Sequence, residues 1–362
     1  MSASTRLGGP RRYLSILAAV SVLIGVLSGC SLSAGSNDSG DTLTLAVWKD
    51  YGSDLPWVAQ DFKKKTGATL KFQYIDSEAN LLKMMAEGNG SIDVGLPNIQ
   101  HVGFGIEDGT FAPLDESRLE NLKDIFPRFA NLKEIRKGGS LYSVPWTWGS
   151  TGLFYVTPQS TPTSIAALWD PANKGKTAIL DDATVTVPTA ALYLGEDPQN
   201  PDMSKITPAL VALKNNAKMV YSSVDDLAKA VSTNTVSLGI ANGDTVGGIG
   251  AEHPTLKYTI PSQGAVGWID TWAISAKSKK KDLAYKWINY MTSKEFLTKW
   301  ANTPADASPA PANEAVVKSL PAATLDRLQV NLDIIDRLAL QLPVPQSRLQ
   351  AWDKAWQTAK AS

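Results

Sequence analysis

A short aromatic and acidic stretch, GAVGWIDTWAIS at residues 264–275, is the part of the sequence best suited to holding a ligand. Its alternation predicts a β-strand in which Trp268, Asp270 and Trp272 share one face. Burying a carboxylate among indole rings is costly unless a cation or hydrogen-bond donors neutralise it. This face is therefore a candidate seat for an ammonium group. The alternative is a core strand whose Asp is satisfied by backbone amides.

Motifs of common enzymes and metal sites do not occur in the sequence. The two histidines, His101 and His253, do not belong to an HExxH motif, and the sequence has no CxxC motif that could complete a zinc site. There is no GxSxG motif, and Cys30 is the only cysteine. Gly175-Lys176-Thr177 lacks the glycine that a phosphate loop needs five positions earlier, where Asp170 stands. We expect no catalytic residue, metal or cofactor, although a glycosidase with paired carboxylates stays open as an alternative.

The amino-terminal residues indicate export and attachment to a membrane. Arg6, Arg11 and Arg12 precede an apolar run at residues 13–27, the layout of an export signal. That run of about 15 residues is shorter than the ~20 that span a bilayer. The following Leu27-Ser28-Gly29-Cys30 resembles the lipobox of bacterial lipoproteins, in which the cysteine is acylated, with palmitate for example, and the chain is cut before it.

We therefore expect a lipoprotein signal peptide at residues 1–29, lipidation at Cys30 and a flexible tether of Gly, Ser and Asp at residues 30–41. The alternatives are a plain secretory signal and a transmembrane anchor. The folded body is then extracytoplasmic and lipid-anchored to the bacterial cell membrane, on its periplasmic side if a second membrane is present.

Length and charge limit the organisation and the partners. A chain of 362 residues exceeds what one hydrophobic core usually supports, which favours two lobes. Removal of residues 1–29 takes three of the 35 basic residues and none of the 35 acidic ones, leaving a net charge of −3. This balance gives no reason to expect nucleic acid as a partner.

The order of predicted elements indicates an α/β fold. Strands at residues 42–48, 69–74 and 92–96 alternate with helices, a pattern typical of a parallel sheet covered by helices. Ligands of such sheets bind at the carboxyl ends of strands, where Trp48, Tyr51 and residues 97–100 fall.

A set of landmarks in fixed order carries a family resemblance. They are VWKDYG (47–52), DVGLPNIQHV (93–102), SVPWTWGSTGLFY (143–155), LWDPANKG (168–175), ILDDA (179–183), GIANGD (239–244) and GWIDTWAI (267–274). In these segments the chain resembles the extracytoplasmic solute-binding proteins of ABC importers, in particular the spermidine/putrescine-binding branch. The resemblance covers about nine tenths of the chain.

The resemblance implies roles for individual residues. Trp48 and Tyr51 resemble the aromatic clamp of the family, and Asp182 resembles the carboxylate that receives one amine. Trp268 and Asp270 resemble the pair that meets the methylene chain and another amine. The other implied ligand contacts are Asn98, Gln100, Asn242, Asp244 and Gln341.

Several positions depart from the polyamine-binding pattern. Val185 stands where that branch has Glu, Ala241 stands where it has Trp, and the tyrosine expected near residues 306–311 is missing. Either Asp181, Asp244 or Asp306 replaces the missing carboxylate, or the ligand has fewer amines. A monocationic or zwitterionic solute is then an alternative with the same mechanism.

The resemblance implies a two-lobed periplasmic-binding-protein fold, with a mostly parallel sheet flanked by helices in each lobe and a hinge between them. We expect lobe 1 at residues 42–148 with about 268–315, and lobe 2 at residues 149–267 with about 316–362. The expected function is that of a monomeric substrate-binding component of an ABC transporter. It would capture a small cationic solute, putrescine or spermidine, by lobe closure and deliver it to a membrane permease. A membrane-anchored hydrolase is the competing class.

Overall fold

The computed structural model describes residues 42–158, 161–304, 308–330 and 332–362. The expected signal peptide, Cys30, the tether and Asp306 lie outside these residues. Among the described residues, no helix combines the length and the apolar composition needed to cross a membrane.

The first group of strands is parallel. Strand β1 (Thr42–Val47) pairs with β2 (Thr69–Tyr74) on one side and with β3 (Val94–Gly95) on the other. The connecting helices are α1 (Pro56–Thr66) and α2 (Glu78–Glu87), and α3 (Ile99–Glu107) follows β3. Each strand is thus followed by a helix, as the alternating sequence predicts.

The second group of strands is parallel as well. Strand β7 (Thr177–Leu180) lies between β8 (Ala217–Tyr221) and β9 (Leu238–Asn242). The helices of this group are α5 (Ala183–Leu194), α6 (Met203–Asn216), α7 (Val224–Ser232) and α8 (Gly243–Glu252). The carboxyl-terminal helix α13 (Gln346–Ala361) packs against α5 and α6.

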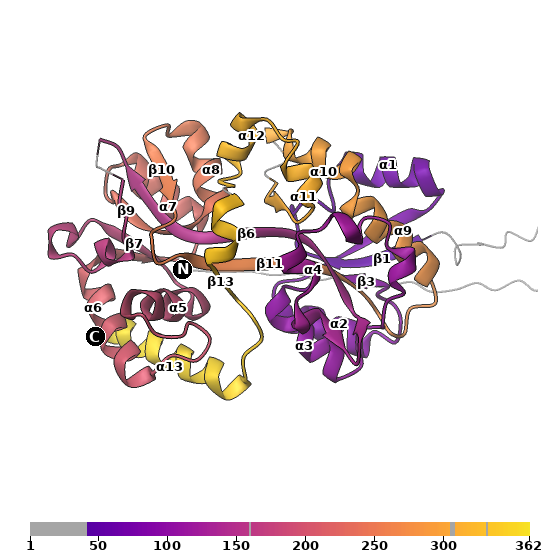
Figure 1. The fold of residues 1–362 in the computed structure, drawn as a ribbon, viewed down its shortest axis with the longest axis horizontal. Coiled ribbons are helices and arrows are strands. Elements are labelled where there is room, and N and C mark those ends of the chain that lie inside the picture. The colour runs from indigo at the N-terminus through magenta and orange to yellow at the C-terminus, as the bar shows by residue number, and fades with distance from the viewer. Residues whose placement is uncertain (1–41, 159–160, 305–307, 331) are drawn as a thin grey trace, which may run out of the picture. The chain divides into compact units, whose positions relative to one another are not determined.

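Two long antiparallel strands join these groups into one mixed sheet (Figure 1). Strand β11 (Ala265–Ile274) pairs with β3 and with β6 (Ser143–Val156), and β6 pairs with β9. The main path is β2-β1-β3-β11-β6-β9-β7-β8. Strands β10 (Leu256–Thr259) and β12 (Ala310–Pro311) add to β6, and β13 (Leu338–Leu340) adds to β11.

The remaining elements are short or lie beside the first group of strands. The helices are α4 (Pro127–Ala130), α9 (Lys281–Thr292), α10 (Lys294–Ala301), α11 (Glu314–Val317) and α12 (Ala322–Arg327), and β4 (Arg136–Lys137) pairs with β5 (Ser140–Leu141). Turns of 3-10 helix occur at Glu116–Arg118, Leu122–Asp124, Lys133–Ile135, Ile165–Leu168, Pro171–Asn173 and Leu332–Arg337.

Separate hydrophobic cores form on the two groups of strands. The first core contains residues of β1, β3, α1–α3, α9 and α10, with a centre of indole rings from Trp146, Trp272, Trp287 and Trp300. The others contain residues of β7, β9 and α5–α8, and Trp352 and Trp356 of α13 join one of them. Strands β6 and β11 pass from one core toward the other.

Candidate ligand-binding site

The carboxyl ends of the parallel strands of both groups face one cavity. Trp48 follows β1, Glu78 begins the helix after β2, and Asn98 follows β3. On the other side Asp182 follows β7 and Asp244 follows β9. Loops at these strand ends lack ladder partners and are free to carry ligand contacts, which is why ligands bind there in α/β folds.

The cavity has a volume of about 420 Å³, within the range of small-molecule sites. Its walls contain every predicted ligand contact except Gln100. The lining residues are Trp48, Lys49, Tyr51, Glu78, Asn98, Thr151, Leu180, Asp182, Val185, Asn242, Asp244, Trp268, Asp270 and Gln341.

Asp270 is the carboxylate at the centre of the first wall. It is only 7% exposed, and its Oδ2 accepts a 2.6 Å hydrogen bond from the Tyr51 hydroxyl. Its Oδ1 accepts a 2.9 Å bond from the Asn98 side-chain amide. Burial raises the pKa of Asp270 to about 6, although both of these hydrogen bonds lower it. Asp270 is thus a buried acid with two neutral donors.

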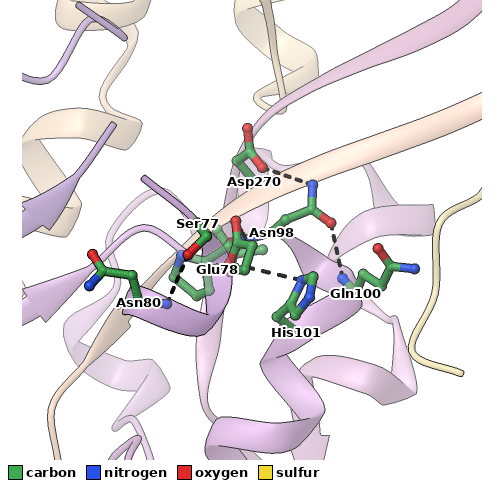
Figure 2. A network of polar contacts seen from close by, with 9 residues as sticks. Ser77, Glu78, Asn80, Asn98, Gln100, His101 and Asp270 are labelled. Carbon is green, nitrogen blue, oxygen red and sulfur yellow. Dashed lines mark hydrogen bonds and ion pairs between the residues drawn. The ribbon is translucent and has the colours of Figure 1, made fainter. Parts of the chain in front are cut away.

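Glu78 lies on the other side of Asn98 (Figure 2). Its Oε1 accepts a 3.1 Å bond from the backbone amide of Asn98, and its Oε2 lies 4.0 Å from Nδ1 of His101. Burial, and then the charge of Asp270, raise the pKa of Glu78 to about 8. Burial lowers the pKa of His101, so His101 offers no compensating positive charge at neutral pH.

Asp244 supplies a carboxylate from the opposite wall, in the first turn of α8. Its Oδ1 is buried without a hydrogen-bond partner among the described residues, and burial raises its pKa. Asn242, directly before α8, accepts a 2.6 Å bond from the hydroxyl of Thr151 on β6. This bond orients the Asn242 side chain at the cavity wall.

Asp182 lines the cavity and also caps helix α5 through hydrogen bonds from Thr184. It is the N-cap of α5, and its Oδ1 accepts from the backbone amide and the hydroxyl of Thr184 at 2.7 and 2.8 Å. The same hydroxyl accepts a 2.9 Å bond from the Gln341 side chain. Asp182 and Gln341 are thus held through one threonine, and one Asp182 oxygen carries both cap bonds.

The aromatic wall consists of Trp48, Tyr51 and Trp268. The indole of Trp268 covers Gly149 of β6, because a Cβ at Gly149 would lie 2.3 Å from the Trp268 ring. Trp272 differs from the expectation that two indoles flank Asp270. It is fully buried and does not line the cavity, because its ring packs against Trp146 and Trp287 in the first core.

Two expected residues are held elsewhere. Gln100 is buried in the first turn of α3, and Figure 2 shows its side chain directed away from Asp270. Asp181 accepts bonds of 2.6 and 2.9 Å from Lys360 and one of 2.7 Å from the indole of Trp356. Because Asp181 is paired inside the molecule and does not line the cavity, it does not replace the missing glutamate at Val185.

The cavity wall also contains four residues that were not predicted from the sequence: Glu78, Lys49, Thr151 and Leu180. A signal for Glu78 was present, because it follows β2 at the same sheet edge as Trp48 and Asn98. Thr151 lies within the long strand β6, where no sequence pattern distinguishes a cavity position from a core position.

Acidic side chains outnumber basic ones in the cavity wall, where Lys49 is the basic residue among those that line it. Helices α2, α3, α5 and α8 direct their amino-terminal ends toward it, and each end supplies about half a positive charge, or about two in total. Four acidic side chains oppose them: Glu78, Asp182, Asp244 and Asp270, of which Glu78, with its pKa raised to about 8 by burial and Asp270, is mostly protonated at pH 7. Within the described residues, the salt bridges include no Lys or Arg paired with any of these four.

A larger cavity of about 670 Å³ lies elsewhere, with Tyr155, Tyr258 and Arg327 in its wall. None of the predicted ligand contacts lines it. In the part of the chain that the structure describes, no three His, Cys, Asp or Glu side chains are grouped to hold a metal ion.

Known proteins place the chain in a family. A family profile described as "Bacterial extracellular solute-binding protein" matches residues 57–325. The chain belongs to this family. The bacterial extracellular solute-binding protein described here is 31% identical over 263 residues to the Spermidine/putrescine-binding periplasmic protein 1 of Haemophilus influenzae, covering 71% of this chain and 72% of the relative. It is 29% identical over 279 residues to the Spermidine/putrescine-binding periplasmic protein of Escherichia coli, covering 75% and 78%.

Solved structures confirm the fold expected for this solute-binding protein. The substrate-binding protein PotD of a spermidine/putrescine ABC transporter from Streptococcus pneumoniae superposes with a TM-score of 0.75 at 19% identity, covering 89% of this chain and 99% of that one. The α/β periplasmic-binding-protein fold predicted from the sequence is therefore confirmed. The continuous sheet through β6 and β11 is a detail that the sequence did not indicate.

Proposed function

We propose that this protein binds a small cationic solute, with putrescine and spermidine as the first candidates, for uptake by an ABC transporter. The observation that carries the proposal is a cavity lined by four acidic side chains and one lysine, Lys49, with no Lys or Arg salt-bridged to the acids within the described chain. Such a cavity lowers its electrostatic energy when a cation enters. The names of the curated relatives support the same ligand class.

The proposed contacts divide by chemistry. A polyamine is an apolar chain with cationic ends, so flat rings suit its methylenes and carboxylates suit its ammonium groups. Trp48, Tyr51 and Trp268 would line the chain, and Asp270 would bind one ammonium group. Asp244 is proposed as the opposing carboxylate in place of the glutamate absent at Val185. Asp182, Asn98, Asn242 and Gln341 complete the proposed contacts.

Binding by closure follows from the division of the site. Ligand contacts to both walls form fully only when the walls approach, so the ligand favours the closed state by its differential affinity. We propose lobe boundaries of 42–148 with 268–315 and 149–267 with 316–362, with the hinge where β6 and β11 pass between the cores. A membrane permease would receive the ligand from a monomeric closed form, and no chemistry would be done on it.

We further propose that Cys30 carries a lipid anchor after removal of residues 1–29. The basic and apolar amino-terminal sequence and the lipobox-like LSGC support this. The anchor would hold the protein on the outer face of the cell membrane and raise its concentration near the permease. Radiolabelled palmitate incorporation that is lost in Cys30→Ala tests the attachment.

A zwitterionic solute is the second candidate. The amino-terminal ends of α5 and α8, together with Lys49 at the cavity, could hold a carboxylate while Asp270 holds an amine. This arrangement needs only one cationic group in the ligand, which fits the apolar Val185.

Calorimetry and thermal shift with polyamines, monoamines, amino acids, sugars and divalent cations test the proposal. We expect putrescine or spermidine to bind and Asp270→Asn to abolish the binding, while Asp353→Asn, an exposed substitution on α13, leaves it unchanged. Binding of amino acids alone would favour the zwitterionic candidate. Binding of sugars alone would refute the cationic assignment, and conversion of a bound compound to product would favour the hydrolase.

A further inference from the structure

Asn98 holds two carboxylates of the ligand cavity at once. Its side-chain amide donates to Oδ1 of Asp270 at 2.9 Å, and its backbone amide donates to Oε1 of Glu78 at 3.1 Å. Figure 2 shows Glu78 and Asp270 on either side of Asn98. Glu78 and Asp270 belong to elements far apart in the chain, so Asn98 fixes them next to each other on one wall.

Glu78 is not needed to cap its own helix. Ser77 is the N-cap of α2, and its hydroxyl already accepts from the backbone amide of Asn80 at 3.2 Å. The Glu78 side chain is 13% exposed, and its Oε2 is buried without a hydrogen-bond partner among the described residues. Glu78 thus lines the cavity with one oxygen that makes no hydrogen bond in the described part of the chain, and the charged neighbour of that oxygen is Nδ1 of His101 at 4.0 Å.

We propose that Glu78 is a specificity-determining residue whose carboxylate receives a second ammonium group of the ligand, next to the group bound by Asp270. This inference rests on the proposed function and deepens it. It adds a recognition carboxylate at the start of α2, on the wall of Asp270, to the opposing carboxylate proposed at Asp244. The cavity would then select ligands with at least two cationic groups.

We expect Glu78 to release a proton when the ligand binds, because of the groups that surround it. The titratable or charged groups that face it or share its cavity are His101, Asp270, Asp244, Asp182, Tyr51 and Lys49. Burial and Asp270 raise the pKa of Glu78 to about 8, so its carboxyl is mostly protonated at pH 7 in the empty cavity. An ammonium group beside it lowers that pKa, so binding expels the proton and the affinity rises with pH between about 6 and 8.

Calorimetry with 1,4-diaminobutane and 1-aminobutane tests the proposal, because the two compounds share a four-carbon chain and differ by one ammonium group. We expect Glu78→Gln to weaken binding of the diamine by roughly tenfold to a hundredfold and to leave the monoamine within about twofold. The matched control is Glu87→Gln, an exposed carboxyl at the end of the same helix α2.

The number of protons released provides a second readout. Titrations at pH 7 in two buffers of different ionisation enthalpy should show more protons released with wild type than with Glu78→Gln. Equal affinity of the two proteins for the diamine, or an equal loss for both amines, would overturn the role of Glu78. If neither wild type nor Glu78→Gln bound either amine, the proposed cationic ligand would be overturned and, with it, this inference.

Discussion

The phenol of Tyr51 donates a 2.6 Å hydrogen bond to the carboxylate of Asp270, although the two residues are 219 positions apart in the sequence. The same hydroxyl lies 3.3 Å from Oγ1 of Thr147 on β6. The loop after β1 is thereby fixed to the two long strands at the cavity. Tyr51 therefore orients the acid that we propose to bind the ligand, in addition to offering its ring.

Removal of this hydroxyl in Tyr51→Phe tests that relationship. Because the bond lowers the pKa of Asp270, its loss moves that pKa further above 6. We expect diamine affinity to fall by roughly threefold to tenfold at pH 6 and by less at pH 8, where Asp270 is ionised in both proteins. Calorimetry at both pH values measures the difference. An equal loss at pH 6 and pH 8 would indicate a packing effect instead.

Gly149→Ala tests the position of Trp268. A Cβ at Gly149 would lie 2.3 Å from the Trp268 ring, so the indole has to move out of its place at the cavity wall. We expect ligand affinity to fall at least about tenfold, with a changed tryptophan emission spectrum in the free protein. Gly248→Ala is the control, because nothing beyond its chain neighbours and the backbone of its own helix lies within 4 Å of its added Cβ. Unchanged affinity in Gly149→Ala would remove Trp268 from the proposed contacts.

The ligand-free protein should lose stability as the pH rises from 5 to 8. Glu78 has a pKa of about 8 in the fold against 4.5 ordinarily, so the fold favours its protonated form. That contribution is fully present below pH 4.5 and is lost as the pH rises through 8. Glu78→Gln should therefore raise the free energy of unfolding at pH 8, by the order of a few kcal/mol, and leave it nearly unchanged at pH 4.5.

Urea denaturation at a series of pH values checks this result. Asp270, whose pKa is about 6, adds a smaller loss that is complete nearer to pH 7. Equal pH profiles for wild type and Glu78→Gln would show that Glu78 is not a buried acid in solution.

Val185→Glu should add recognition of a further amine. Val185 lies in the first turns of α5 and lines the cavity, and the helix amino terminus stabilises an added carboxylate. We expect affinity for the triamine spermidine to rise by roughly tenfold and affinity for 1-aminobutane to stay constant. Val185→Gln serves as the uncharged control of equal length. An equal gain in both variants would show that the added charge is not responsible.

Asp181→Asn should lower the stability of the protein and leave its affinity for the ligand unchanged. Asp181 ties Lys360 and Trp356 of α13 to the end of β7 and stays outside the cavity. Loss of its charge should lower the free energy of unfolding by about 1–3 kcal/mol. Thermal denaturation and calorimetry on one preparation separate the two effects. A large fall in affinity would mean that Asp181 contributes to recognition after all.

The strand-helix alternation was enough to predict Trp48, Tyr51 and Asn98 at the cavity, whereas Asp182, Asn242, Asp244 and Gln341 were implied only by the family resemblance. Trp48 and Asn98 follow buried strands of a parallel sheet, and such strand ends meet at one edge regardless of the details of packing. Strand β11 was also predicted, because its residues alternate as the two faces of a strand do.

Three features of the site depend on long-range packing and could not be predicted from the sequence: the positions of Trp272 and Gln100, and the pKa of Glu78. Trp272 has the same spacing from Asp270 as Trp268, yet core rings from β6 and α9 surround it. Gln100 is two residues from Asn98, but the first turn of α3 buries it. The raised pKa of Glu78 depends on Asp270, a neighbour that no local pattern reveals.

The passage of β6 and β11 through the sheet has a practical consequence for dissecting the molecule. The first core draws on residues before β6 and again after β11, while another draws on residues between them and on α13. Neither half can be expressed as one uninterrupted fragment. Truncation at a single point would therefore leave two incomplete pieces, and exchanging one half with a homologue requires three splice junctions.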